Sequence, residues 1–132
     1  MKRSPMKQGK SARQAAYDKE FEAYKPLVKI RSKGLCEAAT FVLYHFSSLT
    51  AMDLLRTPET QIALDDFLDV GCGIYAVHIH HRKYRSRGGS NQITNLLDIC
   101  LAHHEWIHAH GGFGESANLL GLVLSAGELE ML

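Results

Sequence analysis

The chain has 132 residues, of which 45% are hydrophobic and 22% charged, and its formal net charge is +1. This length predicts a single domain with a modest core, for which a bound metal would be a useful extra stabiliser. No run approaches eighteen apolar residues and the first ten residues are basic and polar, so we expect neither a membrane span nor a signal peptide. The three cysteines lie far apart in the sequence, which favours free thiols or metal ligands in a reducing compartment over disulfides.

Basic residues are concentrated in two segments. Residues 1 to 33 carry ten Lys or Arg against three Asp or Glu, and residues 80 to 90 carry four Lys or Arg and no acid. We expect this distribution if both segments touch a phosphate backbone. Residues 1 to 10 are predicted to be a disordered basic tail, and a solvated tail without a partner is the alternative.

The segment after this tail is predicted to be a helix. Ser11 is a suitable N-cap, and three aromatic residues follow at helical spacing: Tyr17, Phe21 and Tyr24. We interpret this stripe as packing rather than base stacking, and we expect Pro26 to end the helix. Three basic residues then alternate along a short segment that could lie against a nucleic-acid backbone: Lys29, Arg31 and Lys33.

Residues 34 to 73 have a weaker pattern. The apolar run from Thr40 to Phe46 fits a strand or a buried helix, and we favour a helix because alanines precede it and no turn residue interrupts it. Thr57-Pro58-Glu59 predicts a second helix, with a capping hydroxyl, a proline at the first position and an acid in the first turn. Gly71 is expected to end it.

From residue 74 onward the pattern predicts a hairpin followed by a helix. Ile74 to Ile79 is typical of a strand, Gly88-Gly89 supplies a turn, and Ile93 to Ile99 returns toward the first strand. Leu101 to His110 is typical of a helix, which Gly111-Gly112 ends. Residues 117 to 124 predict a short helix end and a strand that cover the core.

Seven of the eight histidines lie between residues 78 and 110, in a recurrent order. That order has three parts: the pair His80-His81, then Asn95, then His104 and His108. Because residues four apart share one helix face, His104 and His108 can converge on one metal ion. Adjacent strand residues point to opposite faces, so His80 and His81 should not share that ion.

This order resembles the HNH endonuclease family, and in particular its short phage-type members. The sequence between the three parts is also similar, with R-S-R-G-G-S-N, then N-L-L and a cysteine, then H-x-x-x-H. The resemblance implies an α+β fold built on a ββα-metal (His-Me finger) core at residues 74 to 110. That core would lie within one domain of residues 11 to 132, with an added N-terminal helix and a helical insertion at about residues 38 to 70.

The resemblance also implies a function and a role for each residue. The protein would be a divalent-metal-dependent DNA endonuclease in the cytoplasm, or in the host cytoplasm if it is viral. His80, His104 and His108 would bind one catalytic ion (Mg, Mn, Ni or Zn), His81 would be the general base, and Asn95 would hold the loop between the strands. An imidazole with an ordinary pKa of about 6.5 can take a proton from water at pH 7, which fits the role of His81.

The basic residues are expected to contact DNA phosphates without reading bases. They are Arg82, Lys83, Arg85, Arg87, Lys29, Arg31 and Lys33. DNA would therefore be the main partner, contacted largely through its backbone, and phage packaging or host DNA-processing proteins would be further partners.

The cysteines indicate a second metal. Phage-type relatives often carry two C-x-x-C pairs, whereas this chain keeps the second as Cys100-x-x-His103 and separates the parts of the first, at Cys36 and Cys72. We favour a structural zinc on these four residues over the alternative that the site is lost and the thiols are buried.

Two other functions remain open. One is a nucleic-acid-binding module that keeps the fold as a scaffold and does not cleave. The other is a metal-stabilised assembly protein of a virus or mobile element. Neither of them requires His81, which is why we favour the nuclease.

Overall fold

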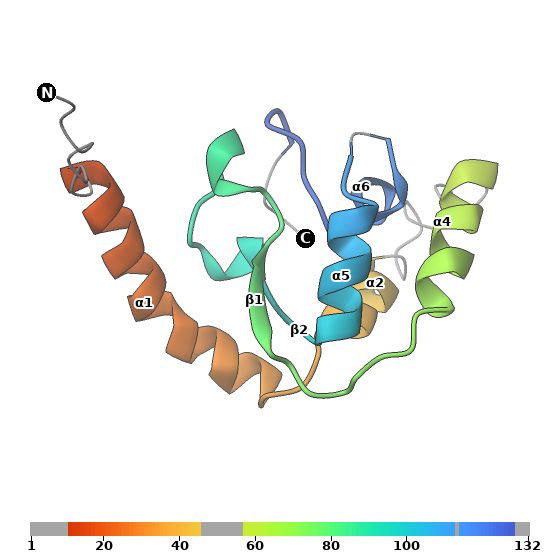
Figure 1. Ribbon diagram of the computed structural model, residues 1–132, viewed down its shortest axis with the longest axis horizontal. Helices are drawn as coiled ribbons and strands as arrows, with labels where there is room; N and C mark the ends of the chain where they lie inside the picture. Colours follow the sequence, from red (N-terminus) through yellow and green to blue (C-terminus); the bar gives the residue numbers. More distant parts are fainter. Residues whose placement is uncertain (1–10, 46–56, 113, 129–132) are drawn as a thin grey trace, which may run out of the picture.

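The computed structural model describes residues 11–45, 57–112 and 114–128, so the predicted tail at residues 1–10 lies outside the described residues. The architecture mixes helices with one antiparallel hairpin, which confirms the expected α+β class. In chain order the elements are α1 (Ala12–Ser32), α2 (Ala38–His45), α4 (Pro58–Leu68), β1 (His78–His81), β2 (Leu96–Ile99), α5 (Leu101–Ala109) and α6 (Ser116–Leu119) (Figure 1). Helices α2 and α4 fall in the segment expected to be a helical insertion.

Two predicted helix starts are confirmed by their caps. The hydroxyl of Ser11 accepts a hydrogen bond from the Gln14 amide at 3.1 Å, and this bond caps α1. Thr57 caps α4 by accepting from the Thr60 amide at 3.4 Å, with Pro58 in the first turn. Each cap satisfies an amide that has no partner within the helix.

Helix α1 does not end at Pro26, which corrects the prediction. A proline inside a helix removes one backbone hydrogen bond and costs about 3 kcal/mol. The turns that follow are held by tertiary contacts, since Val28 is fully buried and the Lys29 ammonium lies 2.8 Å from both carboxylate oxygens of Asp98 on β2. These contacts offset the local cost, and the helix continues to Ser32.

Both strands of the hairpin begin later in the sequence than predicted. β1 begins at His78, because residues 72–77 cross toward the loop after α1. There the backbone amide of Cys36 donates to the Ile74 carbonyl at 2.7 Å. β2 begins at Leu96, since residues 93–95 form a 3-10 turn. The register pairs His80 with Leu97 and His81 with Leu96.

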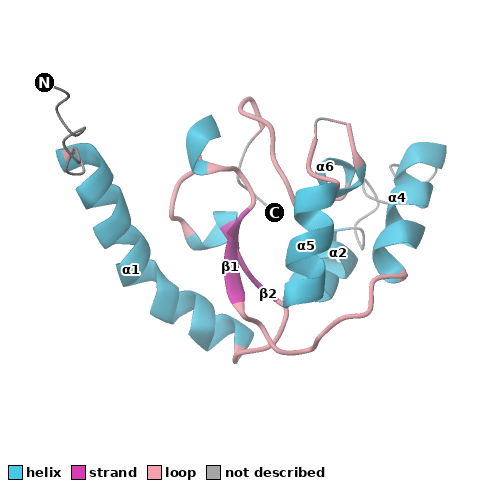
Figure 2. Cartoon of the chain, in the orientation of Figure 1, coloured by secondary structure: helices cyan, strands magenta, loops and turns pink. Residues whose placement is uncertain are grey.

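The two faces of the hairpin are covered by different helices. Figure 1 shows α1 on one side of the hairpin and α5 on the other, with α4 beyond α5. The long loop from α4 to β1 passes beneath the start of α5 in the same view (Figure 2). The main core contains buried residues from α2, α4, β2, α5 and the C-terminal segment: Phe41, Val42, Phe67, Leu97, Ile107 and Leu122.

The segment after α6 covers this core, although the expected strand is reduced to one bridge between Lys83 and Leu124. Leu120, Leu122 and Val123 are fully buried there. Among the described helices, none is both long enough and apolar enough to cross a membrane.

Candidate metal centres

Helix α5 presents histidines on two different faces. Successive residues are rotated by about 100° around a helix. His103 is therefore buried, with 2% exposure, while His104 is half-buried and His108 is exposed. One helix thus contributes to two separate groups of side chains, as its sequence predicts.

The first group, which we name the cysteine cluster, contains Cys36, Cys72, Cys100 and His103. The four potential ligand atoms all lie within 4.8 Å of one another. Nδ1 of His103 lies 3.4 Å from Sγ of Cys36 and 3.3 Å from Sγ of Cys100. Tetrahedral zinc with ordinary bond lengths separates a sulfur from a nitrogen ligand by roughly 3.5 Å. These four residues could therefore hold a metal ion.

Backbone amides point at the sulfurs of this cluster. Gly73 donates to Sγ of Cys100 at 3.3 Å and His103 does so at 3.4 Å, while Ile74 donates to Sγ of Cys72 at 3.3 Å. Burial acts to raise the pKa of Cys100, but the His103 and Gly73 amides and the neighbouring Cys36 and Cys72 thiols lower it overall. Hydrogen bonds of this kind favour the thiolate, which is the form that binds metals.

The chain brings Cys36 to the cluster through backbone pairing. Leu35 and Tyr75 form an antiparallel bridge, so the loop after α1 lies against the loop that carries Cys72. Burial raises the pKa of the Cys36 thiol to about 12, whereas that of Cys100 is lowered, so Cys100 ionises before Cys36. Cys72 is exposed, so the alternative of three buried thiols does not describe the site.

The second group, which we name the histidine face, lies between β1 and α5. The rings of His104 and His108 are 4.5 Å apart, and the rings of His80 and His108 are 6.1 Å apart. The three residues predicted to bind the catalytic ion are thus neighbours. Their donor atoms are more widely spread than those of the cysteine cluster. Among the described residues, the cysteine cluster is the one group whose donor atoms all lie within 4.8 Å of one another.

His80 is held in a single orientation. It is 2% exposed, and its Nε2 lies 2.7 Å from the Leu122 carbonyl oxygen. A carbonyl oxygen only accepts, so Nε2 carries the hydrogen and Nδ1 of the neutral ring keeps its lone pair. Burial lowers the pKa of His80 to about 3, so the ring is neutral at pH 7. Metal-binding histidines usually have their second nitrogen occupied in this way, so His80 fits a ligand role.

His78 also belongs to the histidine face, and sequence reasoning missed it. Its ring stacks on that of His104, with centroids 4.0 Å apart and 26° between the planes. Burial, followed by the nearby His104 and His108 rings, lowers the pKa of His78. The alternation of strand residues was the available signal, because it places His78 and His80 on one face.

His81 points to the other side of β1, toward α1. Its ring lies 4.8 Å from that of Phe21 in an edge arrangement and 6.3 Å from that of Tyr17. Its Nε2 lies 3.0 Å from Oδ1 of Asn91, a fully buried residue that sequence reasoning missed. The aromatic stripe of α1 therefore packs, as predicted, and two of its members pack against the predicted base.

Asn95 ties the loop between the strands together. Its Oδ1 accepts from the Lys83 amide at 2.7 Å, and its Nδ2 donates to the carbonyls of Lys83 at 3.1 Å and Ser90 at 2.8 Å. These are the backbone hydrogen bonds that the resemblance implies. The loop is also tight at Gly89, where a Cβ would overlap the Lys83 carbonyl.

The structure contradicts a phosphate contact for Arg82. Its side chain is 1% exposed, donates to the carbonyls of Gly121 at 2.8 Å and Thr94 at 3.0 Å, and lies 4.5 Å from the Phe41 ring. Arginine is rarely buried unless its donors are paired, which is why its sequence position beside the histidines suggested a surface role. Arg82 instead connects the end of β1 to the C-terminal segment.

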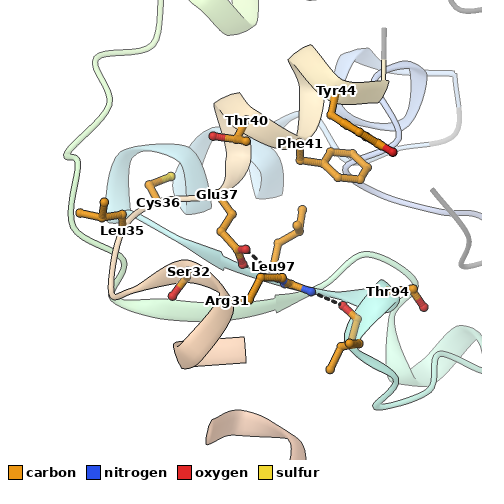
Figure 3. Close-up of a pocket in the computed structure, with 11 residues that line it drawn as sticks. Arg31, Ser32, Leu35, Cys36, Glu37, Thr40, Phe41, Tyr44, Thr94 and Leu97 are labelled. Carbon is orange, nitrogen blue, oxygen red and sulfur yellow. Dashed lines mark hydrogen bonds and ion pairs between the residues drawn. The ribbon is translucent and has the colours of Figure 1, made fainter. Parts of the chain in front are cut away.

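Other predicted phosphate contacts also make internal bonds. Lys29 pairs with Asp98 at 2.8 Å. Arg31 pairs with Glu37 at 2.7 Å and donates to the Ile93 carbonyl at 2.8 Å (Figure 3). It also donates to the Leu96 carbonyl at 2.6 Å. Arg31 and Glu37 also line a cavity of about 600 Å³, whose lining residues include Cys36 but no histidine.

The basic residues of the loop after β1 likewise include side chains that are bonded within the protein. Arg85 pairs with Asp18 at 2.9 Å, and Lys83 donates to the Glu128 carbonyl at 2.7 Å. Lys33 and Arg87 have exposed side chains and remain predicted phosphate contacts.

Comparisons of the chain with protein-family models, curated proteins and solved structures found no match. Its function is therefore inferred from the residues of the cysteine cluster and the histidine face.

Proposed function

We propose that this protein is a divalent-metal-dependent DNA endonuclease with a ββα-metal core made by β1, β2 and α5. The observation that carries the proposal is the meeting of His80, His104 and His108 between β1 and α5, with His81 as the residue that follows His80 on β1. A protein that only bound DNA would have no need for three neighbouring imidazoles and an adjacent fourth one. The predicted phosphate contacts alone support binding but not cleavage.

His80, His104 and His108 would hold one divalent ion. The tautomer of His80 leaves Nδ1 available, and His104 and His108 are four residues apart on one helix face. A bound Mg, Mn, Ni or Zn ion would neutralise charge on the scissile phosphate and on the leaving oxygen. His104 has a pKa lowered by burial and by the nearby His108, which favours its neutral imidazole over the cation.

His81 would act as the general base. A water molecule attacks phosphorus and gives its proton to the imidazole, while the new P–O bond forms. The bond between phosphorus and the 3′ oxygen breaks, and that oxygen leaves with the electron pair and is later protonated. Asn95 supports this step by holding the loop that follows His81.

The cysteine cluster would hold a structural zinc. Four protein ligands, three of them sulfur, complete a tetrahedral shell and leave no position for substrate. Soft thiolates select zinc over magnesium, so this ion differs from the catalytic one. Zinc here would tie the loop after α1, the loop before β1 and the start of α5 together.

DNA would be contacted through its backbone by the exposed basic residues, including Lys33 and Arg87. The same basic residues could serve a phage packaging or host DNA-processing complex. Residues 1 to 10 carry four further Lys or Arg.

A supercoiled-plasmid assay tests the proposal. Purified protein should convert supercoiled DNA to nicked or linear forms with added Mg, Mn, Ni or Zn. A chelator should stop the reaction, and His81→Ala should be inactive at the same protein concentration. Binding of the plasmid without cleavage in any of the four metals would overturn the proposal in favour of a non-cleaving nucleic-acid-binding module.

A further inference from the structure

Asn91 lies between the proposed general base and helix α1. It is fully buried, and its Oδ1 is 3.0 Å from Nε2 of His81. Its Nδ2 donates to the main-chain carbonyl of Tyr17 at 2.8 Å. The side chain therefore connects His81 to the backbone of an element outside the hairpin and α5.

These two contacts determine which nitrogen of His81 carries hydrogen. The Tyr17 carbonyl can only accept, so the amide group of Asn91 must face it, and Oδ1 must face His81. Because Oδ1 only accepts, Nε2 of His81 is the nitrogen that carries the hydrogen. The lone pair of the neutral ring is then on Nδ1.

The carbonyl of Tyr17 is itself fixed relative to the loop that carries Asn91. The Tyr17 hydroxyl donates to the Gly89 carbonyl at 3.1 Å. The guanidinium of Arg85 lies 4.0 Å from the centre of the Tyr17 ring, and it pairs with the neighbouring Asp18 at 2.9 Å. Helix α1 thus holds the loop at several points around the contact with Asn91.

We infer that Asn91 is a positioning residue for His81. By bonding both His81 and the backbone of α1, Asn91 holds the imidazole with Nδ1 as its basic nitrogen. This inference rests on the proposed nuclease function, since only that function requires a base. It also gives α1 a role beyond DNA contact, because its Tyr17 carbonyl orients the reacting side chain through Asn91. A base needs both the right tautomer and a fixed position to take a proton efficiently.

Nuclear magnetic resonance of protein labelled with 15N-histidine tests the tautomer without reference to activity. In zinc-loaded protein at pH 8, Nε2 of His81 should carry a hydrogen whose signal is visible because the bond to Asn91 protects it from exchange with water. Asn91→Ala should remove that signal. A hydrogen on Nδ1 in the native protein, or an unchanged Nε2 signal in Asn91→Ala, would overturn the inference.

Cleavage kinetics test the consequence. Asn91→Ala should lower kcat by about 10- to 100-fold with Mg²⁺, while KM for plasmid DNA stays within about twofold. Gln92→Ala is the matched control, because the neighbouring side chain is exposed and should leave kcat unchanged. Folded Asn91→Ala, checked by circular dichroism and melting, that cleaves at the native rate would sink the positioning role.

Two results separate this inference from the proposed function. If the native protein does not cleave DNA, the nuclease proposal fails, whereas the resonance experiment still reports whether Asn91 orients His81. Tyr17→Phe provides a further check, because it removes the hydroxyl but keeps the carbonyl. The Nε2 signal should survive in Tyr17→Phe, and its loss there would assign the orientation to the hydroxyl of Tyr17, which bonds the Gly89 carbonyl, instead of to Asn91.

Discussion

The cysteine cluster and the histidine face take side chains from the same helix, yet their donor atoms are arranged differently. In the cysteine cluster the four donor atoms lie within 4.8 Å of one another, and backbone amides point at two of the sulfurs. On the histidine face the rings of His80 and His108 are 6.1 Å apart, and the His108 side chain is exposed. The first group can supply all four ligands of a tetrahedral ion from the protein, although its Cys72 is exposed. The second group has more widely spread donors.

This difference fits the two tasks that we propose for the chain. A closed set of four ligands contributes folding free energy, which a chain of this size can use because its core is modest. A site that acts on a substrate must instead leave room for it. His103 and His104 are adjacent in sequence, so one residue of rotation on α5 separates the two tasks.

Loss of the cysteine cluster should have the largest effect. Cys100→Ser removes the sulfur that receives two backbone amides, so zinc should fall from about one per chain to none, as measured by elemental analysis of purified protein. Structural zinc sites bind with about 10 to 16 kcal/mol, comparable to the whole stability of a domain. The variant should therefore lose its cooperative thermal transition in circular dichroism.

Cys72→His is the matched control, because this position is exposed and histidine also binds zinc. It should keep zinc and most of the melting temperature. Native protein that is stripped of zinc by a chelator and melts as before would show that packing alone holds the cluster together.

Replacement of His81 should affect the reaction and leave the closed site intact. His81→Ala should lower the cleavage rate at least 100-fold, because a general base acts in the transition state. DNA affinity and zinc content should stay unchanged, measured by fluorescence anisotropy and elemental analysis. Retention of more than about a tenth of the native rate would remove His81 from the role of base.

Changes on the two faces of α5 should separate the two ions. His104→Ala and His108→Ala should each weaken binding of the catalytic metal by about 10- to 100-fold and should keep zinc. Titration calorimetry with Mn²⁺ measures the loss of affinity. His103→Ala should do the reverse, with loss of zinc and of stability. Equal effects of His103→Ala and His104→Ala on both metals would show that the two groups are not independent.

The ligand groups could be predicted from the sequence because their signals are local. A four-residue spacing places His104 and His108 on one helix face, and adjacency separates His103 from them. Cys36 and Cys72 were harder, since 35 residues lie between them and only the resemblance linked them. The fold brings both to His103, which no periodicity could establish.

Other features depend on tertiary contacts and could not be predicted. Pro26 lies inside α1 because the Lys29–Asp98 pair and the buried Val28 hold the following turns. Arg82 is buried because two carbonyls and the Phe41 ring surround it. These partners are distant in sequence, so local propensity and charge alone suggested a helix end and a surface cation.

The basic residues also differ, since some pair within the protein and others are exposed. Their replacement should have the smallest effects predicted here on stability and on DNA binding. Asp98 is fully buried and pairs with Lys29, whose side chain is 48% exposed. Lys29→Met leaves that carboxylate with the Ser32 hydroxyl at 2.7 Å but without its cation. We expect a loss of about 1 to 3 kcal/mol in urea unfolding, limited by the access of water to this side of the pair. Addition of Asp98→Asn should recover part of that loss.

Lys33→Gln should behave differently, because the Lys33 side chain is exposed at the end of α1. The free energy of unfolding of the Lys33→Gln variant should stay within about 0.5 kcal/mol of the native value. If Lys33 touches a phosphate, the slope of log DNA affinity against log salt should become shallower by about 1, since one fewer counterion is released. Fluorescence anisotropy between about 50 and 200 mM salt measures that slope. The same slope change in Lys29→Met, with unchanged stability, would show that Lys29 faces DNA and that its pair with Asp98 does not hold α1 to the hairpin.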